Sequence, residues 1–117
     1  MPAEAPTLLV FWESVVDDLL ARTARFPRSV RFSLSARIDN LALDVLEAIV
    51  EARFTSEGKA ERLSRANLAL EKLRVLLRIA HTRKVLDTGG LEHLARRLDE
   101  AGRAGGRKRD EVGPIRQ

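Results

Sequence analysis

The 117-residue sequence has no cysteine, no tyrosine and one tryptophan, and aromatic residues make up only 4% of it. Without cysteine, the chain can form neither a disulfide framework nor a thiolate metal site, and thiol-based nucleophilic catalysis is excluded. No apolar run approaches the roughly 18 residues of a membrane span. The first residues include an acidic side chain where a signal peptide would have basic ones. We therefore expect a cytoplasmic protein without a membrane partner.

The residues that are abundant favour helices. Hydrophobic residues make up 44% of the sequence and charged residues 32%, which suits one domain with a single core. Leucine, alanine and arginine dominate, and the alternating β-branched pattern of strands is absent. The formal net charge of +4 comes mainly from arginine rather than lysine, and arginine suits phosphate and acidic partners.

Apolar residues at helical spacing predict four helices, over residues 7–24, 29–54, 59–85 and 90 to about 102 or a little beyond, the last being shorter than the second and third. Thr7, Ser29 and Thr88 are the expected N-caps, and the Gly105-Gly106 pair is expected to end the last helix. Short connections make successive helices antiparallel neighbours, so we predict an all-α, antiparallel up-down-up-down four-helix bundle over residues 7–106. Residues 1–6 are expected to form a flexible N-terminus, and residues 107–117 a basic disordered tail. The core stripes are predicted to be Leu8, Trp12, Val15 and Leu19; Leu34, Ile38, Leu41, Val45 and Ile49; Leu63, Ala66, Leu70, Leu73, Leu77 and Ala80; and Leu91, Leu94, Leu98 and Ala101.

The predicted helix over residues 59–85 carries a second apolar stripe, which a lone bundle does not need. Leu68, Val75 and Ile79 are separated from the main stripe by a polar ridge that includes Arg74 and Arg78. A second stripe fits a second copy of the chain, so these three apolar residues are a predicted oligomer interface. The alternative is that they are ordinary, partly exposed apolar residues.

Several arginines have no acidic residue at helical spacing, whereas others do, such as Arg22 with Asp18. Residues 22–38 contain five arginines and no acid, a concentration that favours a phosphate-contacting surface. The alternative is pairing with acids from other helices or from a neighbouring subunit, and Asp44 could neutralise Arg37. The arginines without a local acid are Arg25, Arg28, Arg31, Arg37, Arg62 and Arg78.

The sequence contains no recognisable catalytic arrangement. Neither His81 nor His93 has a glutamate three residues before it, as a di-metal helix bundle would require. Glycine-rich phosphate loops and nucleophile motifs are also absent. We therefore predict that the chain is not an enzyme and holds neither a metal nor another cofactor.

Three stretches suggest a family. They are residues 26–34 (FPRSVRFSL) with Arg37-Ile38 and residues 46–52 (LEAIVEA), residues 66–80 (ANLALEKLRVLLRIA), and residues 98–103 (LDEAGR). Together they span about residues 8–106. They resemble the four-helix-bundle proteins encoded in 23S rRNA intervening sequences and their relatives, the Avd-like accessory variability determinants of diversity-generating retroelements. The sequence departs from that pattern after Arg103, because no tryptophan follows the glycine pair.

The resemblance implies a homopentameric barrel of four-helix bundles with a basic surface and channel. In the retroelement branch, it implies reverse transcriptase and RNA or DNA as partners, in error-prone copying of a template RNA into cDNA. The intervening-sequence branch leaves a protein-binding adaptor without nucleic-acid affinity as the alternative. A small-ligand carrier is a third idea, against which the bulky leucine-rich interior argues.

The resemblance places the contacts at Arg31, Arg37, Arg74 and Arg78, unless these arginines form salt bridges that join the second and third helices. With the arginine-rich segment, the predicted nucleic-acid-binding set is Arg25, Arg28, Arg31, Arg37, Arg74 and Arg78.

Overall fold

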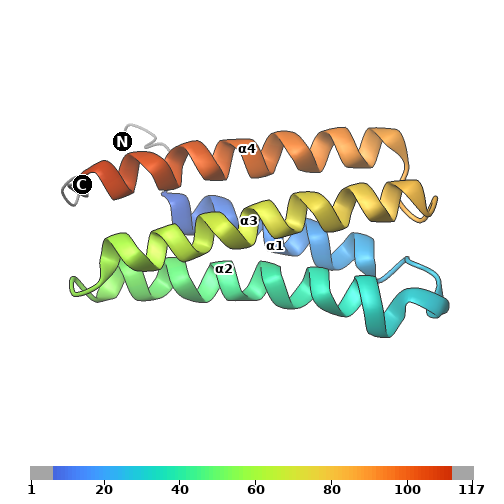
Figure 1. The fold of residues 1–117 in the computed structure, drawn as a ribbon, viewed down its shortest axis with the longest axis horizontal. Helices are drawn as coiled ribbons and strands as arrows, with labels where there is room; N and C mark the ends of the chain where they lie inside the picture. Colours follow the sequence, from blue (N-terminus) through green and yellow to red (C-terminus); the bar gives the residue numbers. More distant parts are fainter. Residues whose placement is uncertain (1–6, 112–117) are drawn as a thin grey trace, which may run out of the picture.

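The computed structural model describes residues 7–111, with side chains through Gly105. This part of the chain forms four α-helices and no strand, which confirms the all-α class: α1 (Leu8–Thr23), α2 (Ala36–Phe54), α3 (Lys59–Thr82) and α4 (Thr88–Glu111). A 3-10 turn, η1 (Arg28–Val30), and a π turn, η2 (Arg31–Ser35), lead into α2. The helices lie side by side and are joined by short connections at their ends (Figure 1). None of the described helices is both long and apolar enough to cross a membrane.

The predicted core stripes lie between the helices. All six stripe residues of α3 are buried, from Leu63 to Ala80, whereas Leu8, Leu34, Leu41 and Leu91 on the other helices are half-buried. Trp12 of α1 is fully buried, and its indole Nε1 donates a 2.9 Å hydrogen bond to the carbonyl oxygen of Ala42 in α2. A gap of about 10 Å³ remains inside the bundle. The interior is therefore filled by side chains, as the leucine-rich stripes predicted.

The entry into α2 differs from the predicted continuous helix that starts at Ser29. Ser29 lies within η1 and makes no capping hydrogen bond, so its predicted role as an N-cap is wrong. Val30 and Ser35 are both buried although they are five residues apart. One wide π turn places such a pair on the same face, which an α-helix with 3.6 residues per turn does not do.

The α3–α4 connection also differs from the prediction. Helix α3 ends at Thr82, three residues before the predicted end, and Lys84 takes the left-handed conformation with φ of 64°. The Val85 amide donates to the Ala80 carbonyl and the Lys84 amide to that of His81, the Schellman pattern. At the start of α4, the predicted cap Thr88 is replaced by Asp87, whose Oδ1 accepts from the Gly90 amide at 2.6 Å.

Helix α4 continues through the glycines that were predicted to end it. It has 24 residues, as many as α3 and more than the 19 of α2, so the predicted end near residue 102 is wrong, and so is the prediction that this helix is shorter than the second and third. A Cβ on Gly105 would lie 3.3 Å from Asn67 Oδ1, and one on Gly102 would lie 3.4 Å from an Arg74 nitrogen. These glycines therefore let α4 approach α3 closely.

The longer α4 also changes the predicted end of the bundle. Residues 107–111 belong to this helix rather than to the predicted tail. The predictions for residues 1–6 and 112–117 lie outside the described residues.

Candidate nucleic-acid and oligomer surfaces

Three of the predicted contact arginines lie at one end of the bundle, where α1 passes into η1 and η2. Arg25, Arg28 and Arg31, here called the arginine turn, are all exposed. In the described part of the chain, none of them has a carboxylate oxygen within 4 Å, whereas nearby Arg22 has Asp18 Oδ1 at 2.7 Å from its Nε. The arginine turn thus presents three uncompensated guanidinium groups to solvent.

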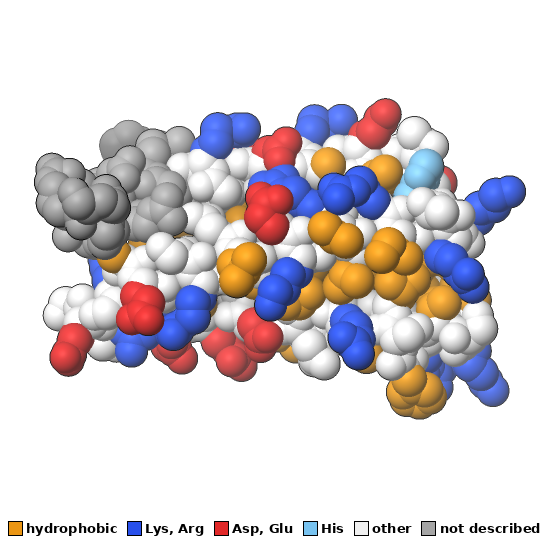
Figure 2. Space-filling view, viewed as in Figure 1, with side chains coloured by type: hydrophobic (Ala, Val, Ile, Leu, Met, Phe, Trp, Pro, Cys, Tyr) orange, Lys and Arg blue, Asp and Glu red, His pale blue; other side chains and the backbone are white. Residues whose placement is uncertain are grey.

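The α3–α4 connection brings further positive charge to the same end of the bundle (Figure 1). Arg83 and Lys84 are exposed there and also lack an acidic partner among residues 7–105. Lys and Arg side chains gather at this end in the space-filling view (Figure 2). Sequence reasoning missed these two residues because their proximity to the arginine turn depends on how the helices are arranged. The adjacent Arg-Lys pair was the available signal.

Arg37 lies apart from the arginine turn, in a groove of about 500 Å³ between α2 and α3. Asp44 lines the same groove but forms no ion pair with Arg37, so the predicted neutralisation is absent. Lys72 of α3 also lines the groove and has no carboxylate within 4 Å in the described chain. Lys72 follows Leu68 by four residues, so helical spacing could have identified it as a basic residue beside the second apolar stripe.

Arg74 and Arg78 occupy the side of α3 that faces α4. Arg74 is half-buried and bonds to two carboxylates, with its Nε 3.1 Å from Glu71 Oε2 and its Nη1 on Asp99 of α4. It therefore links α3 to α4, not the second helix to the third as the alternative interpretation proposed. Arg78 is exposed, lines a groove with Leu91 of α4 and has no acidic partner in the described residues.

A polar cluster on α1 and α4 centres on Asp18. Its carboxylate receives Arg22 Nε at 2.7 Å, while His93 Nε2 lies at 2.8 Å and Arg97 Nη1 at 3.2 Å. Burial raises the pKa of this carboxyl, but hydrogen bonds from Arg22 and His93 outweigh it, and the pKa lies below its usual value. The Arg97 guanidinium also lies 5.3 Å from the centre of the Phe11 ring. The cluster therefore ties α4 to α1.

The predicted oligomer interface is an exposed apolar surface. Leu68, Val75 and Ile79 of α3 are 57%, 44% and 43% exposed. Apolar side chains form a strip across the face where α2 and α3 lie, with basic side chains beside it (Figure 2). Phe32 and Phe54, in η2 and α2, are more exposed still. The structure thus leaves apolar surface uncovered where the sequence predicted a second seam.

The six predicted contact arginines do not form one compact site. They divide between the arginine turn, the α2–α3 groove and the α3–α4 side, and their nucleic-acid role stays a prediction. His81 hydrogen-bonds to Thr88, and His93 belongs to the Asp18 cluster. Within the described residues, no three His, Asp or Glu side chains gather as a metal site would require. The features that suggest interactions lie on the surface.

The fold and these surfaces define a class: a small all-α helical bundle with a basic end and an uncovered apolar strip. A family model described as bAvd-like matches residues 10–110, and the chain therefore belongs to this family. Membership confirms the resemblance to Avd-like proteins and supports an accessory role of the Avd type at the level of the family. The chain matches no curated protein.

Proposed function

We propose that this protein is a non-catalytic, cytoplasmic accessory protein of a diversity-generating retroelement that binds its reverse transcriptase and the template RNA or cDNA. The observation that carries the proposal is the arginine turn. Arg25, Arg28 and Arg31 are exposed and have no carboxylate neighbour in the described chain. Family membership supplies the biological setting.

Electrostatics explains why this arrangement suits phosphates. A guanidinium that is paired within the protein must break that pair to bind a phosphate, whereas an unpaired one releases counterions from the nucleic acid without this cost. Arg37 and Arg78 are unpaired in the same sense and extend the proposed surface. Arg74 belongs to the proposed set but already contacts two carboxylates, so its replacement should weaken binding least.

We further propose that the chain is an up-down-up-down bundle that assembles into a homopentamer. The placement of the connections at alternate ends of the helices supports the first part (Figure 1). The exposed Leu68, Val75 and Ile79 support self-association, since an apolar surface is stabilised by leaving water. The subunit count follows from the resemblance to the Avd-like proteins.

The test is RNA binding measured by fluorescence anisotropy across a salt series. We expect the affinity for a structured RNA to fall steeply with salt, with a slope set by the number of neutralised phosphates. Changing Arg25, Arg28 and Arg31 together to Gln should weaken binding and lower the slope by about 2–3, since each phosphate contributes roughly 0.7–0.9.

The matched control replaces three exposed arginines elsewhere, Arg65, Arg96 and Arg103, with Gln. This variant has the same net charge as the arginine-turn variant, so a difference between them reflects position. Equal losses in both would contradict the proposed surface. An absence of RNA affinity in an intact oligomer would favour the protein-binding adaptor instead.

A further inference from the structure

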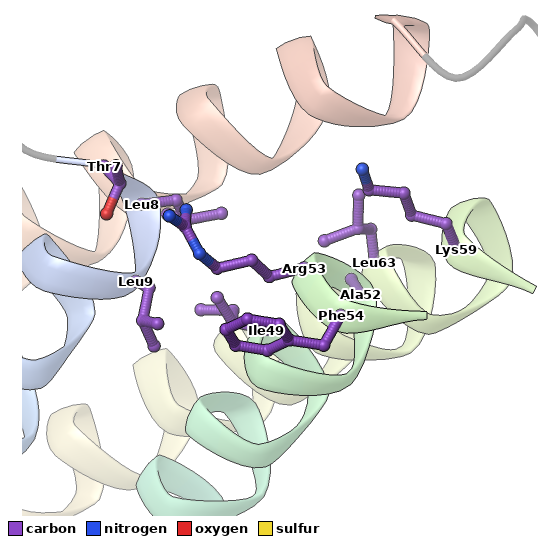
Figure 3. A pocket seen from close by; sticks show the side chains of 9 residues that line it. All are labelled: Thr7, Leu8, Leu9, Ile49, Ala52, Arg53, Phe54, Lys59 and Leu63. Carbon is purple, nitrogen blue, oxygen red and sulfur yellow. The ribbon is translucent and has the colours of Figure 1, made fainter. Parts of the chain in front are cut away.

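A pocket of about 440 Å³ opens at the end of the bundle where α2 passes into α3, opposite the arginine turn (Figures 1 and 3). Its apolar lining includes Leu9 of α1, Ile49 and Ala52 of α2, and Leu63 of α3. Its volume falls within the range of about 300–1,000 Å³ typical of small-molecule sites. The leucine-rich interior does not contradict such a site, because the pocket lies at the end of the bundle.

Two basic side chains line this pocket. Arg53 extends from α2 across it towards the start of α1, and Lys59 borders it on the α3 side (Figure 3). Neither has a carboxylate oxygen within 4 Å among the described residues. The Arg53 guanidinium lies 5.8 Å from the Phe54 ring centre, a contact that leaves its charge uncompensated.

The position of Lys59 adds to the positive potential. It is the first residue of α3, where the helix dipole also places positive partial charge, so a cation there is unfavourable. The N-cap residue, Gly58, has no side chain to cap that helix end, and Glu61 is the acidic residue of the first turn. A bound anion would relieve the repulsion.

We propose that this pocket binds a small apolar carboxylate of the medium-chain alkanoate class. The alkyl chain lies against Leu9, Ile49, Ala52 and Leu63, and the carboxylate is held by Arg53 and Lys59. This site is separate from the arginine turn, so its success or failure does not depend on RNA binding. It gives the protein a ligand class that its surface charges alone do not indicate.

Calorimetric titration of the full chain with hexanoate, octanoate and decanoate tests the proposal, at concentrations below micelle formation. Burial of each added methylene should tighten binding by about fourfold until the pocket is full. Decylammonium has the same tail but a positive head and should not compete. Binding that is independent of chain length, or equal for both head groups, would overturn the proposal.

Charge-removing variants then locate the site. Changing Arg53 and Lys59 together to Gln should weaken decanoate binding about tenfold or more, because two charge-assisted hydrogen bonds are lost. The control changes Arg65 and Lys72, exposed cations outside the pocket, to Gln and should bind decanoate as the wild type does. Equal binding by the two double variants would overturn the assignment. A fall in decanoate binding as the chain associates would instead identify a second copy as the occupant.

Discussion

At the scale of single residues, Asp18 has the largest number of charged partners among the described side chains. Three basic groups from α1 and α4 surround its largely buried carboxylate, so removing the carboxylate would take an acceptor from each of them. Its neighbour Asp17 is exposed and lacks such contacts in the described chain. Of these two adjacent aspartates, Asp18 therefore has a structural role and Asp17 is solvated.

We predict that Asp18→Asn lowers the free energy of unfolding at pH 7 by about 1–3 kcal/mol, the usual cost of losing hydrogen bonds to charged groups. Chemical denaturation followed by circular dichroism measures this change. Asp17→Asn is the control and should stay within about 0.5 kcal/mol of the wild type. Equal effects of the two substitutions would show that the cluster adds nothing to stability.

The lowered pKa of Asp18 gives this contribution a defined pH dependence. Because the folded pKa is below the unfolded one, the stabilisation is complete above about pH 4, the ordinary value for aspartate, and is lost as pH falls through the folded pKa. The stability difference between wild type and Asp18→Asn should therefore shrink below about pH 4. A difference that stays constant on acidification would contradict the lowered pKa.

Charge pairs within one helix could be predicted only in part from the sequence, and pairs between helices could not. Asp18–Arg22, Glu61–Arg65 and Glu71–Arg74 follow from helical spacing and are present. The same spacing predicts Glu92–Arg96 and Asp99–Arg103, which are absent from the described residues, and Asp99 pairs with Arg74 of α3 instead. Arg62, predicted to lack a local acid, has its Nε 3.3 Å from Glu51 Oε1 of α2. Such a contact depends on how two helices are placed, which spacing along one helix does not determine.

At the scale of elements, helix faces were more predictable than helix ends. The stripes of α3 and α4 repeat leucine and alanine at three- and four-residue spacing, so their buried faces follow directly from periodicity. Glycine was ambiguous, because it serves both as a helix terminator and as a site of close approach. Gly102 and Gly105 allow α4 to approach α3 closely. The sequence does not reveal this, because the residues of α3 that face these glycines are known only from the folded structure.

The end of α3 could not be predicted because the glycine that usually marks a helix end is missing there. Lys84 occupies the left-handed position where glycine is usual. We predict that Lys84→Gly raises the free energy of unfolding by about 0.5–1 kcal/mol. Left-handed geometry costs a non-glycine residue about 1–2 kcal/mol, and the extra freedom of unfolded glycine offsets about 0.5–1 of that. Thermal or chemical denaturation measures the change.

The control is Lys72→Gly, on an exposed face in the middle of α3. Glycine in a helix interior should lower stability there by about 1 kcal/mol. Two substitutions of the same chemistry should therefore have opposite signs. A loss of stability in Lys84→Gly would contradict the Schellman geometry at this helix end.

At the scale of the whole molecule, the second apolar surface could be predicted from the sequence. The distribution of the predicted contact arginines over the surface of the molecule could not. The exposed strip follows from counting apolar stripes on one helix. The splitting of the six arginines among three places follows from the packing of α3 against α2 and α4. Of these three places, the arginine turn comes closest to a compact basic site, because its three arginines are close together along the chain.

Assembly through the strip makes a direct prediction about mass. Changing Val75 and Ile79 together to Lys should reduce the oligomer to monomers or cause aggregation, because burying two added charges is strongly unfavourable. Val10 and Leu20 are also exposed apolar residues but lie on α1, so changing both to Lys is the matched control and should leave the mass unchanged. Size-exclusion chromatography with light scattering measures both. Normal assembly of the Val75 and Ile79 variant would remove the strip from the interface.

The central claim is that a basic surface on an assembled helical bundle binds nucleic acid through its phosphates. The most direct test is particle mass by light scattering, with and without a structured RNA, at about 50 and 200 mM salt, between which phosphate-driven binding weakens by orders of magnitude. We predict a pentamer-sized particle that takes up RNA at the lower salt and releases it at the higher. A monomer that ignores RNA at both salt concentrations would contradict both the assembly and the phosphate-binding surface.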